Sequence, residues 1–393
     1  MLPRRQFLSI TAALAAKRTF AAEGHLIAEY DQQGIHRTGT VVDRASAEWL
    51  AGLVRITGLT PALEPFSLSR VDPGPCYIES ADRRVEGLPM FDSSFTDAMG
   101  ITGRLGPAGS DAAIGLIEVI PNNEAGPLLE LRRSGKHRAI VAVTRGGGTG
   151  LSPVNAANFA HPYGPPVLLV AREEAEWLRS LAMPPMTVRL ATQVGRSQVE
   201  AFNVVAVRKG TDAKLAPVVV MTPRSGWWHC ASERGGGLYC WLEVMRAVTE
   251  PARDFIFIAS SGHELGHLGL DSFIQKRGDI IKGAHAWIHF GANIGAATGP
   301  AGTMQFSEEA MQSLAMREIS KTGITVNQRP PGQAPAGEAG NIHRGGGHYI
   351  SLVGGNDLFH SEADRWPQAV NTAALSKLAQ AFAGIARTLA DAS

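Results

Sequence analysis

Residues 260 to 270 read SSGHELGHLGL and contain two histidines at the spacing His263-Glu264-x-x-His267, which can support zinc chemistry. In an α-helix this spacing places two imidazoles on one face, where they share one zinc ion while the intervening Glu activates water. Such a zincin site requires a helix through His263 and a third ligand from a later residue, such as Glu308 or Glu309. The sequence upstream of the motif decides whether that helix forms.

The segment before the motif favours a strand instead. Residues 255–259, FIFIA, are a short apolar run of β-favouring residues without helical periodicity, and residues 260–262 close the run as a turn. We therefore expect a buried strand, a turn and then the N-terminus of a helix. This order places His263 and Glu264 at the carboxyl end of a strand, where open α/β sheets bind their ligands.

Composition narrows the possible partners. The chain has 393 residues, with 37 basic and 36 acidic side chains and a net charge of +1. This balance gives no electrostatic reason to expect nucleic acid or an anionic membrane as partner, whereas a peptide or small amide-like ligand stays open. Three cysteines allow at most one disulfide. We expect no membrane span in the mature chain, because no later segment approaches the ~20 apolar residues of a spanning helix.

The amino terminus predicts export. Residues 4–8, RRQFL, fit a twin-arginine signal, and a short apolar segment and a candidate cleavage region near TFAAE follow them. A basic, frayed helix is the alternative. We expect a signal peptide over residues 1–23 and a periplasmic or extracellular protein.

The order of the remaining segments predicts an α/β protein with an insert. Strand and helix patterns alternate over 24–66 and 200–393, which indicates a mainly parallel, twisted sheet with helices on both faces. Residues 67–199 instead contain short apolar strands separated by Gly-rich and Pro-rich turns, which predicts an inserted β-rich module. Residues 329–340, RPPGQAPAGEAG, form a loop that either covers a pocket or only connects two elements.

Several segments together resemble metallopeptidase family 28, the co-catalytic di-zinc aminopeptidases and glutamate carboxypeptidase. GHELGHLGLDSF aligns with the family's Gly-Glu-Glu-x-Gly-x-x-Gly segment, and LFHSEADRW aligns with its Tyr-His-Thr-x-x-Asp segment. GPPVLLVAREEAEWL is similar to the family's protease-associated insert, and FNVVAVRKGTD to the strand that returns to the main domain. The resemblance covers nearly the whole mature chain and implies the zinc aminopeptidase fold.

The resemblance also implies which family ligands are kept. Glu264 and His360 stand at two of the five zinc-ligand positions, and His263 replaces the Glu that serves as general base. The other ligand positions and one supporting position carry residues that do not bind zinc or are only approximately aligned: Pro223, Ser225, Ser232 and Gly291 or a close neighbour. Two ligands cannot assemble a bridged di-zinc centre, so none is expected.

Further polar residues fall in segments expected to meet at the carboxyl ends of the sheet: His229, Glu233, His289, His343 and His348. One possibility is a single zinc or other divalent metal held by Glu264, His360 and one of His229, His263 or His289, with water as fourth ligand. The other is metal-free acid–base chemistry by histidine.

Two functions follow from these possibilities. The chain is either an exported aminopeptidase-like hydrolase of a peptide or amide bond with a rebuilt metal site, or a non-catalytic pseudopeptidase that uses the cleft for binding. In the first case His263, Glu264 and His360 are the expected catalytic residues. Fold resemblance alone does not choose between them.

Overall fold

Four parallel strands lie at the centre of the larger lobe, in the order β14, β11, β9, β10. Their bounds are Tyr349–Val353, Ala286–Phe290, Val218–Pro223 and Phe255–Ser260. The antiparallel strands β12 (Thr303–Phe306) and β8 (Thr187–Arg208) flank them, and the short β13 (Asn327–Gln328) follows β12. The computed structural model describes residues 23–81, 83–121, 126–300 and 302–391.

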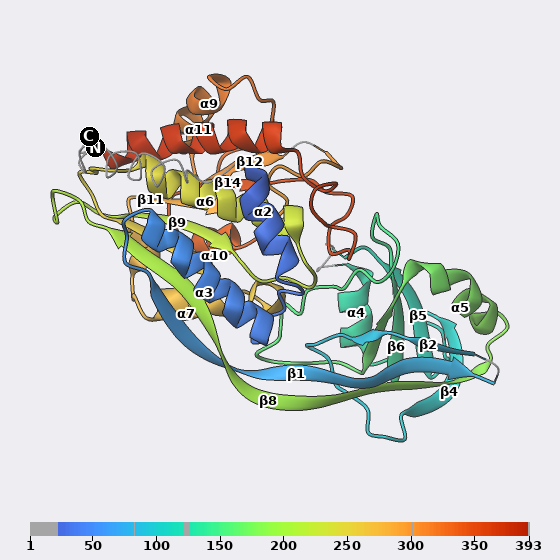
Figure 1. Ribbon diagram of the computed structural model, residues 1–393. Coiled ribbons are helices and arrows are strands. Elements are labelled where there is room, and N and C mark those ends of the chain that lie inside the picture. The colour runs from blue at the N-terminus through green and yellow to red at the C-terminus, as the bar shows by residue number, and fades with distance from the viewer. Residues whose placement is uncertain (1–22, 82, 122–125, 301, 392–393) are drawn as a thin grey trace, which may run out of the picture.

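Helices cover both faces of this sheet (Figure 1). Alternate residues of β9 serve the two faces: Val218 and Val220 pack in one core cluster, and Val219 and Met221 in another. The first face carries α2 (Glu23–Gln32), α3 (Val41–Ile56), α6 (Gly236–Ala247), α9 (Glu309–Ser320) and α11 (Thr372–Ala390). The second carries α7 (Leu268–Gln275), α8 (Ile280–Gly283) and α10 (Ala339–Arg344). The predicted α/β class with a mainly parallel sheet is confirmed.

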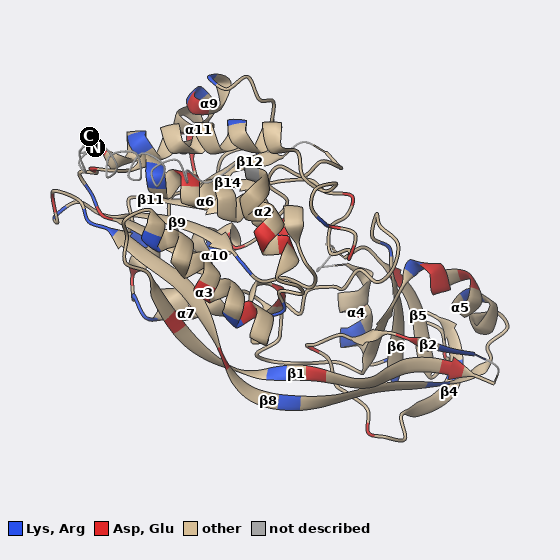
Figure 2. Cartoon of the chain, viewed as in Figure 1, with Lys and Arg blue, Asp and Glu red and all other residues tan. Residues whose placement is uncertain are grey.

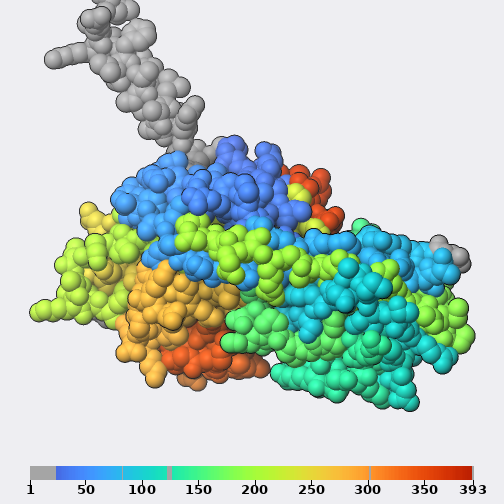
Figure 3. Space-filling view, turned by 90° about the horizontal axis from the view of Figure 1, so that it is seen from below, coloured from blue at the N-terminus to red at the C-terminus, as the bar shows by residue number. Residues whose placement is uncertain are grey.

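Two long antiparallel strands, β1 (Ala62–Ser80) and β8, extend from the larger lobe into a smaller one (Figure 1). The smaller lobe has its own hydrophobic core and lies at one end of the molecule (Figure 3). Its strands are β2 (Arg83–Glu86), β3 (Leu88–Pro89), β4 (Ile101–Pro107), β5 (Ile114–Val119), β6 (Ala139–Thr144) and β7 (Val167–Val170). Its helices are α4 (Pro127–Ser134), the one-turn η1 (Arg172–Glu174) and α5 (Ala175–Ala182).

The predicted limits of the insert, 67 and 199, fall within β1 and β8. These two strands pair from Ala62 opposite Val205 to Glu79 opposite Arg189, with one irregularity near Pro73. The two lobes therefore share a continuous pair of strands. A protease-associated character of the smaller lobe stays a prediction.

The lobes meet in an apolar cluster that includes Phe91 and Phe159 from the smaller lobe and Trp227 and Leu265 from the larger one. Phe91 and Trp227 pack edge to face, with ring centroids 5.1 Å apart. This contact seats the smaller lobe beside the carboxyl ends of β9 and β10, where the candidate site lies.

Charged residues of both signs are distributed over both lobes (Figure 2). The signal peptide is predicted over residues 1–23, of which residues 1–22 lie outside the described part of the chain. No helix within the described ranges is long and apolar enough to cross a lipid bilayer.

Candidate functional site

The HELGH sequence is a sharp turn and not a continuous α-helix. β10 ends at Ser260, the 3-10 helix η3 spans His263–Leu265, and α7 begins only at Leu268. Gly266 and His267 between them have φ angles of 79° and 69°. A left-handed backbone at both positions breaks the α-helical register that a shared zinc ion requires. The strand and turn predicted from the apolar run are confirmed, and the zincin geometry is absent at these residues.

The turn also receives the smaller lobe. The Ala156 N–H donates a hydrogen bond of 2.8 Å to the Glu264 carbonyl oxygen. A Cβ atom at Gly266 would lie only 2.5 Å from the Ala157 carbonyl oxygen, and the positive φ of Gly266 independently favours glycine. Residues 156–157 therefore form part of the site.

Glu264 is fully buried, and hydrogen bonds occupy both of its carboxylate oxygens. The backbone N–H and the hydroxyl of Thr38 donate to Oε1 at 2.8 and 2.6 Å, and the Ser225 hydroxyl donates to Oε2 at 2.7 Å. Burial raises the pKa of Glu264, and these hydrogen bonds oppose that shift. The carboxylate ties the loop before α3 to the ends of β9 and β10, which is a structural role.

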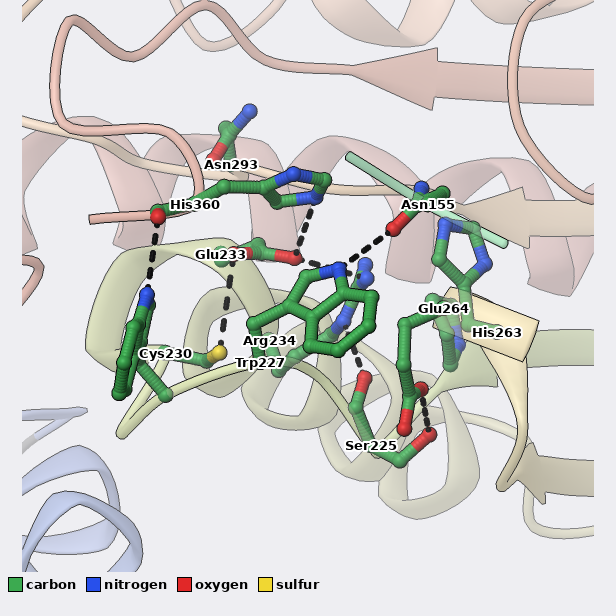
Figure 4. A network of polar contacts seen from close by, with 12 residues as sticks. Asn155, Ser225, Trp227, Cys230, Glu233, Arg234, His263, Glu264, Asn293 and His360 are labelled. Atoms are coloured by element: carbon green, nitrogen blue, oxygen red, sulfur yellow. Dashed lines mark hydrogen bonds and ion pairs between the residues drawn. The ribbon is translucent and has the colours of Figure 1, made fainter. Parts of the chain in front are cut away.

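His360, the second residue predicted from the sequence as a metal ligand, belongs to a buried chain of polar side chains. Its Nδ1 donates to the Pro153 carbonyl oxygen at 2.7 Å, which fixes the proton on Nδ1 in the neutral ring. Its Nε2 lies 3.6 Å from Glu233 Oε1, and Glu233 Oε1 in turn lies 2.8 Å from Arg234 Nη2. All three side chains are at most 1 % exposed. Figure 4 shows them within one network of polar contacts.

Glu233 and Arg234 lie on η2, a π-helical turn at Ala231–Gly235. Asp364 holds the start of this turn, because its two carboxylate oxygens accept the N–H groups of Ser232 and Glu233 at 2.9 Å each. Burial raises the pKa of Asp364 to about 7, and the Glu233 carboxylate contributes to this shift.

A second cluster centres on Glu338, which belongs to the Pro/Gly-rich loop 329–340 and lies at the end of β10. Glu338 is fully buried, and the Ser260 hydroxyl lies 2.9 and 3.0 Å from its two oxygens. His263 Nδ1 lies 3.3 Å from Glu338 Oε1. Burial and then the charge of Arg234 lower the pKa of His263 well below 6.5, so the ring is neutral near pH 7 and shares a hydrogen bond, not an ion pair, with Glu338.

His289 lies on β11 beside the same loop. Its Nδ1 contacts the Ser351 hydroxyl at 2.8 Å, and a Cβ atom at Gly337 would lie 3.2 Å from its ring. Burial lowers the pKa of His289 to about 4, against the opposing charge of Glu338. His289 therefore joins His263 and Glu338, as the sequence placed it at the same edge of the sheet.

A cavity of about 360 Å³ opens beside this second cluster. His263 is 6 % exposed, and its ring stacks on that of His267 with centroids 4.8 Å apart. His267 Nδ1 contacts the Asn341 side-chain oxygen at 3.0 Å. The cavity lining is polar: Asn155, Ala157, His263, Gly266, His267, Asp271, Asn341 and Arg344.

The other predicted site residues lie apart from these clusters. His348 precedes β14 and therefore lies at the amino end of that strand, where its Nδ1 pairs with Glu308 at 2.9 Å. His343 contacts Tyr349, the first residue of β14. His229 is partly exposed near Asp31 and Arg365. The structure does not bring these three histidines together with His263 and Glu338.

The residues present do not fit a metal centre. Throughout the described ranges, no group of three or more His, Cys, Asp or Glu side chains is arranged to hold a metal ion. Glu264 uses both oxygens on Thr38 and Ser225, and His360 faces Glu233. A single-metal site from Glu264 and His360 would require these contacts to be exchanged for the metal.

The fold is that of the zinc aminopeptidases. The chain superposes on a zinc aminopeptidase from Bacillus subtilis with a TM-score of 0.77 and 16% identity, covering 94% of this chain and 95% of that one. An aminopeptidase from Aneurinibacillus sp. strain AM-1 superposes with a TM-score of 0.71 and 13% identity, covering 94% of this chain and 93% of that one. A peptidase M28 precursor from Shewanella amazonensis superposes with a TM-score of 0.72 and 16% identity, covering 98% of this chain and 97% of that one. No protein-family model and no curated protein sequence matches the chain.

Proposed function

We propose that this chain is an exported member of metallopeptidase family 28 that hydrolyses a peptide or amide bond through a rebuilt, metal-independent centre. The observation that carries the proposal is the His263–Glu338 pair, which lies at the carboxyl end of a central strand and opens on a polar cavity. Parallel α/β sheets bind ligands at this edge. The similarity to aminopeptidase structures supports the fold and, through it, the choice of substrate class.

His263 supplies the acid–base chemistry in this proposal. With its proton on Nδ1 toward the Glu338 carboxylate, the neutral ring has Nε2 as an acceptor. Nε2 takes a proton from water in the cavity, and the resulting hydroxide adds to the carbonyl carbon of the bound amide. The imidazolium then returns that proton to the leaving nitrogen as the C–N bond breaks. Glu338 stabilises the imidazolium and fixes the ring orientation.

Glu264 and His360 have a supporting role in this scheme. Their hydrogen bonds to Thr38, Ser225 and Pro153 hold the turn after β10, the end of β9 and the smaller lobe in place. They therefore position the cleft without contacting the reacting atoms.

The same contacts favour a second function, in which the chain is a pseudopeptidase that binds a peptide or small amide-like ligand without cleaving it. Glu264 and His360 form hydrogen bonds within the protein, and ligand binding requires only the cavity. The cavity lining then selects the ligand.

A substrate panel separates the two functions. Amino-acyl amides, short peptides and esters are offered to the purified protein after chelator treatment, and again with added zinc, manganese or cobalt. We expect hydrolysis that survives chelation and that His263→Ala removes. Hydrolysis that requires added metal contradicts the rebuilt centre, and no turnover of any substrate under any condition supports the pseudopeptidase.

A further inference from the structure

Arg234 is an arginine side chain with no exposed surface in the middle of the candidate site. It projects from η2, and its Nε donates to the Ser225 carbonyl oxygen at 2.7 Å while Nη2 lies 2.8 Å from Glu233 Oε1. Figure 4 shows the guanidinium between Glu233 and Ser225, with Glu264 nearby. A cation in this position is costly to bury and requires a compensating charge.

Glu233 supplies that charge. Burial alone would lower the pKa of Arg234, but the Glu233 carboxylate raises it, and Glu264 adds to the effect. The same carboxylate has two further neighbours: His360 Nε2 lies 3.6 Å from Oε1, and Cys230 Sγ lies 3.6 Å from Oε2. One thiol and one imidazole thus lie beside the carboxylate that pairs with the guanidinium. Thiol, carboxylate and imidazole are the groups that bind zinc in proteins.

We propose that Arg234 is the resident cation of this centre and that its guanidinium takes the place of a metal ion, so that the native chain does not bind zinc at Cys230, Glu233 and His360. The proposal rests on the ion pair and the donor set. It holds whether the chain is a hydrolase or a pseudopeptidase, since metal uptake is measured without a substrate.

The physical reason is like-charge repulsion in a region with little water. A divalent ion bound by Glu233 would lie beside a fixed positive charge, where screening is weak. It would also have to share the carboxylate oxygen that Arg234 already uses. Removing the arginine side chain reverses both effects, because it leaves a vacated volume next to an uncompensated carboxylate.

The test measures zinc binding to the full chain after chelator treatment. Binding is followed by isothermal titration with zinc chloride, and its effect on stability by thermal unfolding with and without zinc. Wild type should take up no zinc that depends on His360. Arg234→Ala should gain one equivalent, with a zinc-dependent rise in Tm, and the added substitution His360→Ala should abolish that gain. Arg234→Lys keeps the positive charge and should not gain the site.

Arg224 provides the matched control. It is equally buried, and it pairs with Asp43 at 2.9 Å and with the carbonyl oxygens of Asp43 and Phe202. Arg224→Ala should lower the free energy of unfolding, because the buried Asp43 carboxylate loses its ion-pair partner. This variant should not gain zinc binding. A gain in Arg224→Ala equal to that in Arg234→Ala would show that loosened packing, and not the vacated centre, takes up the metal.

Three results would overturn the proposal. The first is a wild-type equivalent of zinc that His360→Ala removes. The second is a folded Arg234→Ala protein that binds no zinc. The third concerns an Arg234→Ala protein that is unfolded without metal. Zinc should then restore the circular dichroism of the folded state. If zinc restores folding in neither Arg234→Ala nor Arg234→Gln, the proposal is wrong.

Discussion

The two polar clusters at the carboxyl edge of the sheet use similar residue types in opposite ways. In the cluster of Cys230, Glu233, Arg234 and His360, every side chain is sealed from solvent. In the cluster of Glu338 and His263, one fully buried carboxylate supports a ring that reaches a cavity. The difference teaches that burial and access, more than residue type, decide which histidine can do chemistry here.

This contrast also bears on Glu264 and His360, the two residues that the sequence aligned with zinc-ligand positions. The sequence predicts both as ligands, whereas in the structure their contacts are those of a polar core, in which each charged or polar group has a protein partner. His263 departs from the pattern and is the one that reaches the cavity. Identity at an aligned position therefore says less about function than the contacts of the side chain.

The largest expected effect is on catalysis at the open cluster. His263→Ala should lower kcat/KM by about 10²–10⁴-fold, the usual contribution of a general acid–base group. Circular dichroism should show an unchanged fold. Because the pKa of His263 is lowered, the base form persists at neutral pH, and the acid limb of the kcat/KM profile should lie below pH 6.5. An active protein whose kcat/KM is unaffected by His263→Ala would transfer the chemistry away from this cluster.

The second effect is on stability at the sealed cluster. Glu233→Ala leaves the Arg234 guanidinium buried without its carboxylate, and such a loss costs about 3–5 kcal/mol of unfolding free energy. Urea unfolding measures it. Glu48→Ala is the control, since Glu48 pairs with Arg44 at the surface, where a pair contributes only ~0–1 kcal/mol. Equal losses in the two variants would mean that Arg234 is not held by Glu233.

The third effect is a pH dependence that Asp364 introduces. Its folded pKa is raised to about 7 from 3.8, so the folded state binds the proton more tightly than the unfolded state. This contribution is fully present below the unfolded pKa and is lost as the pH rises through about 7.

Asp364→Asn tests this sign. Between pH 6 and 8, wild type should lose on the order of 1 kcal/mol of unfolding free energy relative to the variant. The comparison is made by urea unfolding of both proteins at each pH, because His263 and His289 titrate equally in both and cancel. A difference that stays constant with pH contradicts a raised pKa for Asp364.

Local sequence patterns predicted the framework of this site. The apolar run at 255–259 and the residues 260–262 that close it gave β10 and its turn, because a short unbroken apolar run is typical of a strand covered on both faces. The same reasoning placed His263 and His289 at one edge of the sheet.

The partners in each cluster could not be predicted in this way. Glu338 is 75 residues from His263, and the path of the 329–340 loop alone brings them together. From the sequence, that loop either covers a pocket or only connects two elements, and its composition does not indicate that its carboxylate is buried. Arg234 was missed because an arginine beside Glu233 resembles an ordinary surface pair in sequence. Burial of that pair depends on packing from segments distant in the chain.

The smallest effect is expected at His348, which the sequence grouped with the site. Its side chain is 50% exposed, and its only ion-pair partner among the described residues is Glu308. It lies at the amino end of β14, whereas the cavity lies beyond the carboxyl end of β10. His348→Ala should therefore change the unfolding free energy by less than about 0.5 kcal/mol and leave kcat/KM unchanged. Urea unfolding and the substrate panel measure both, with Glu308→Ala as the matched control. A loss of activity comparable to that of His263→Ala would mean that the two ends of the sheet are coupled, and the contrast between the open and sealed clusters would no longer account for function.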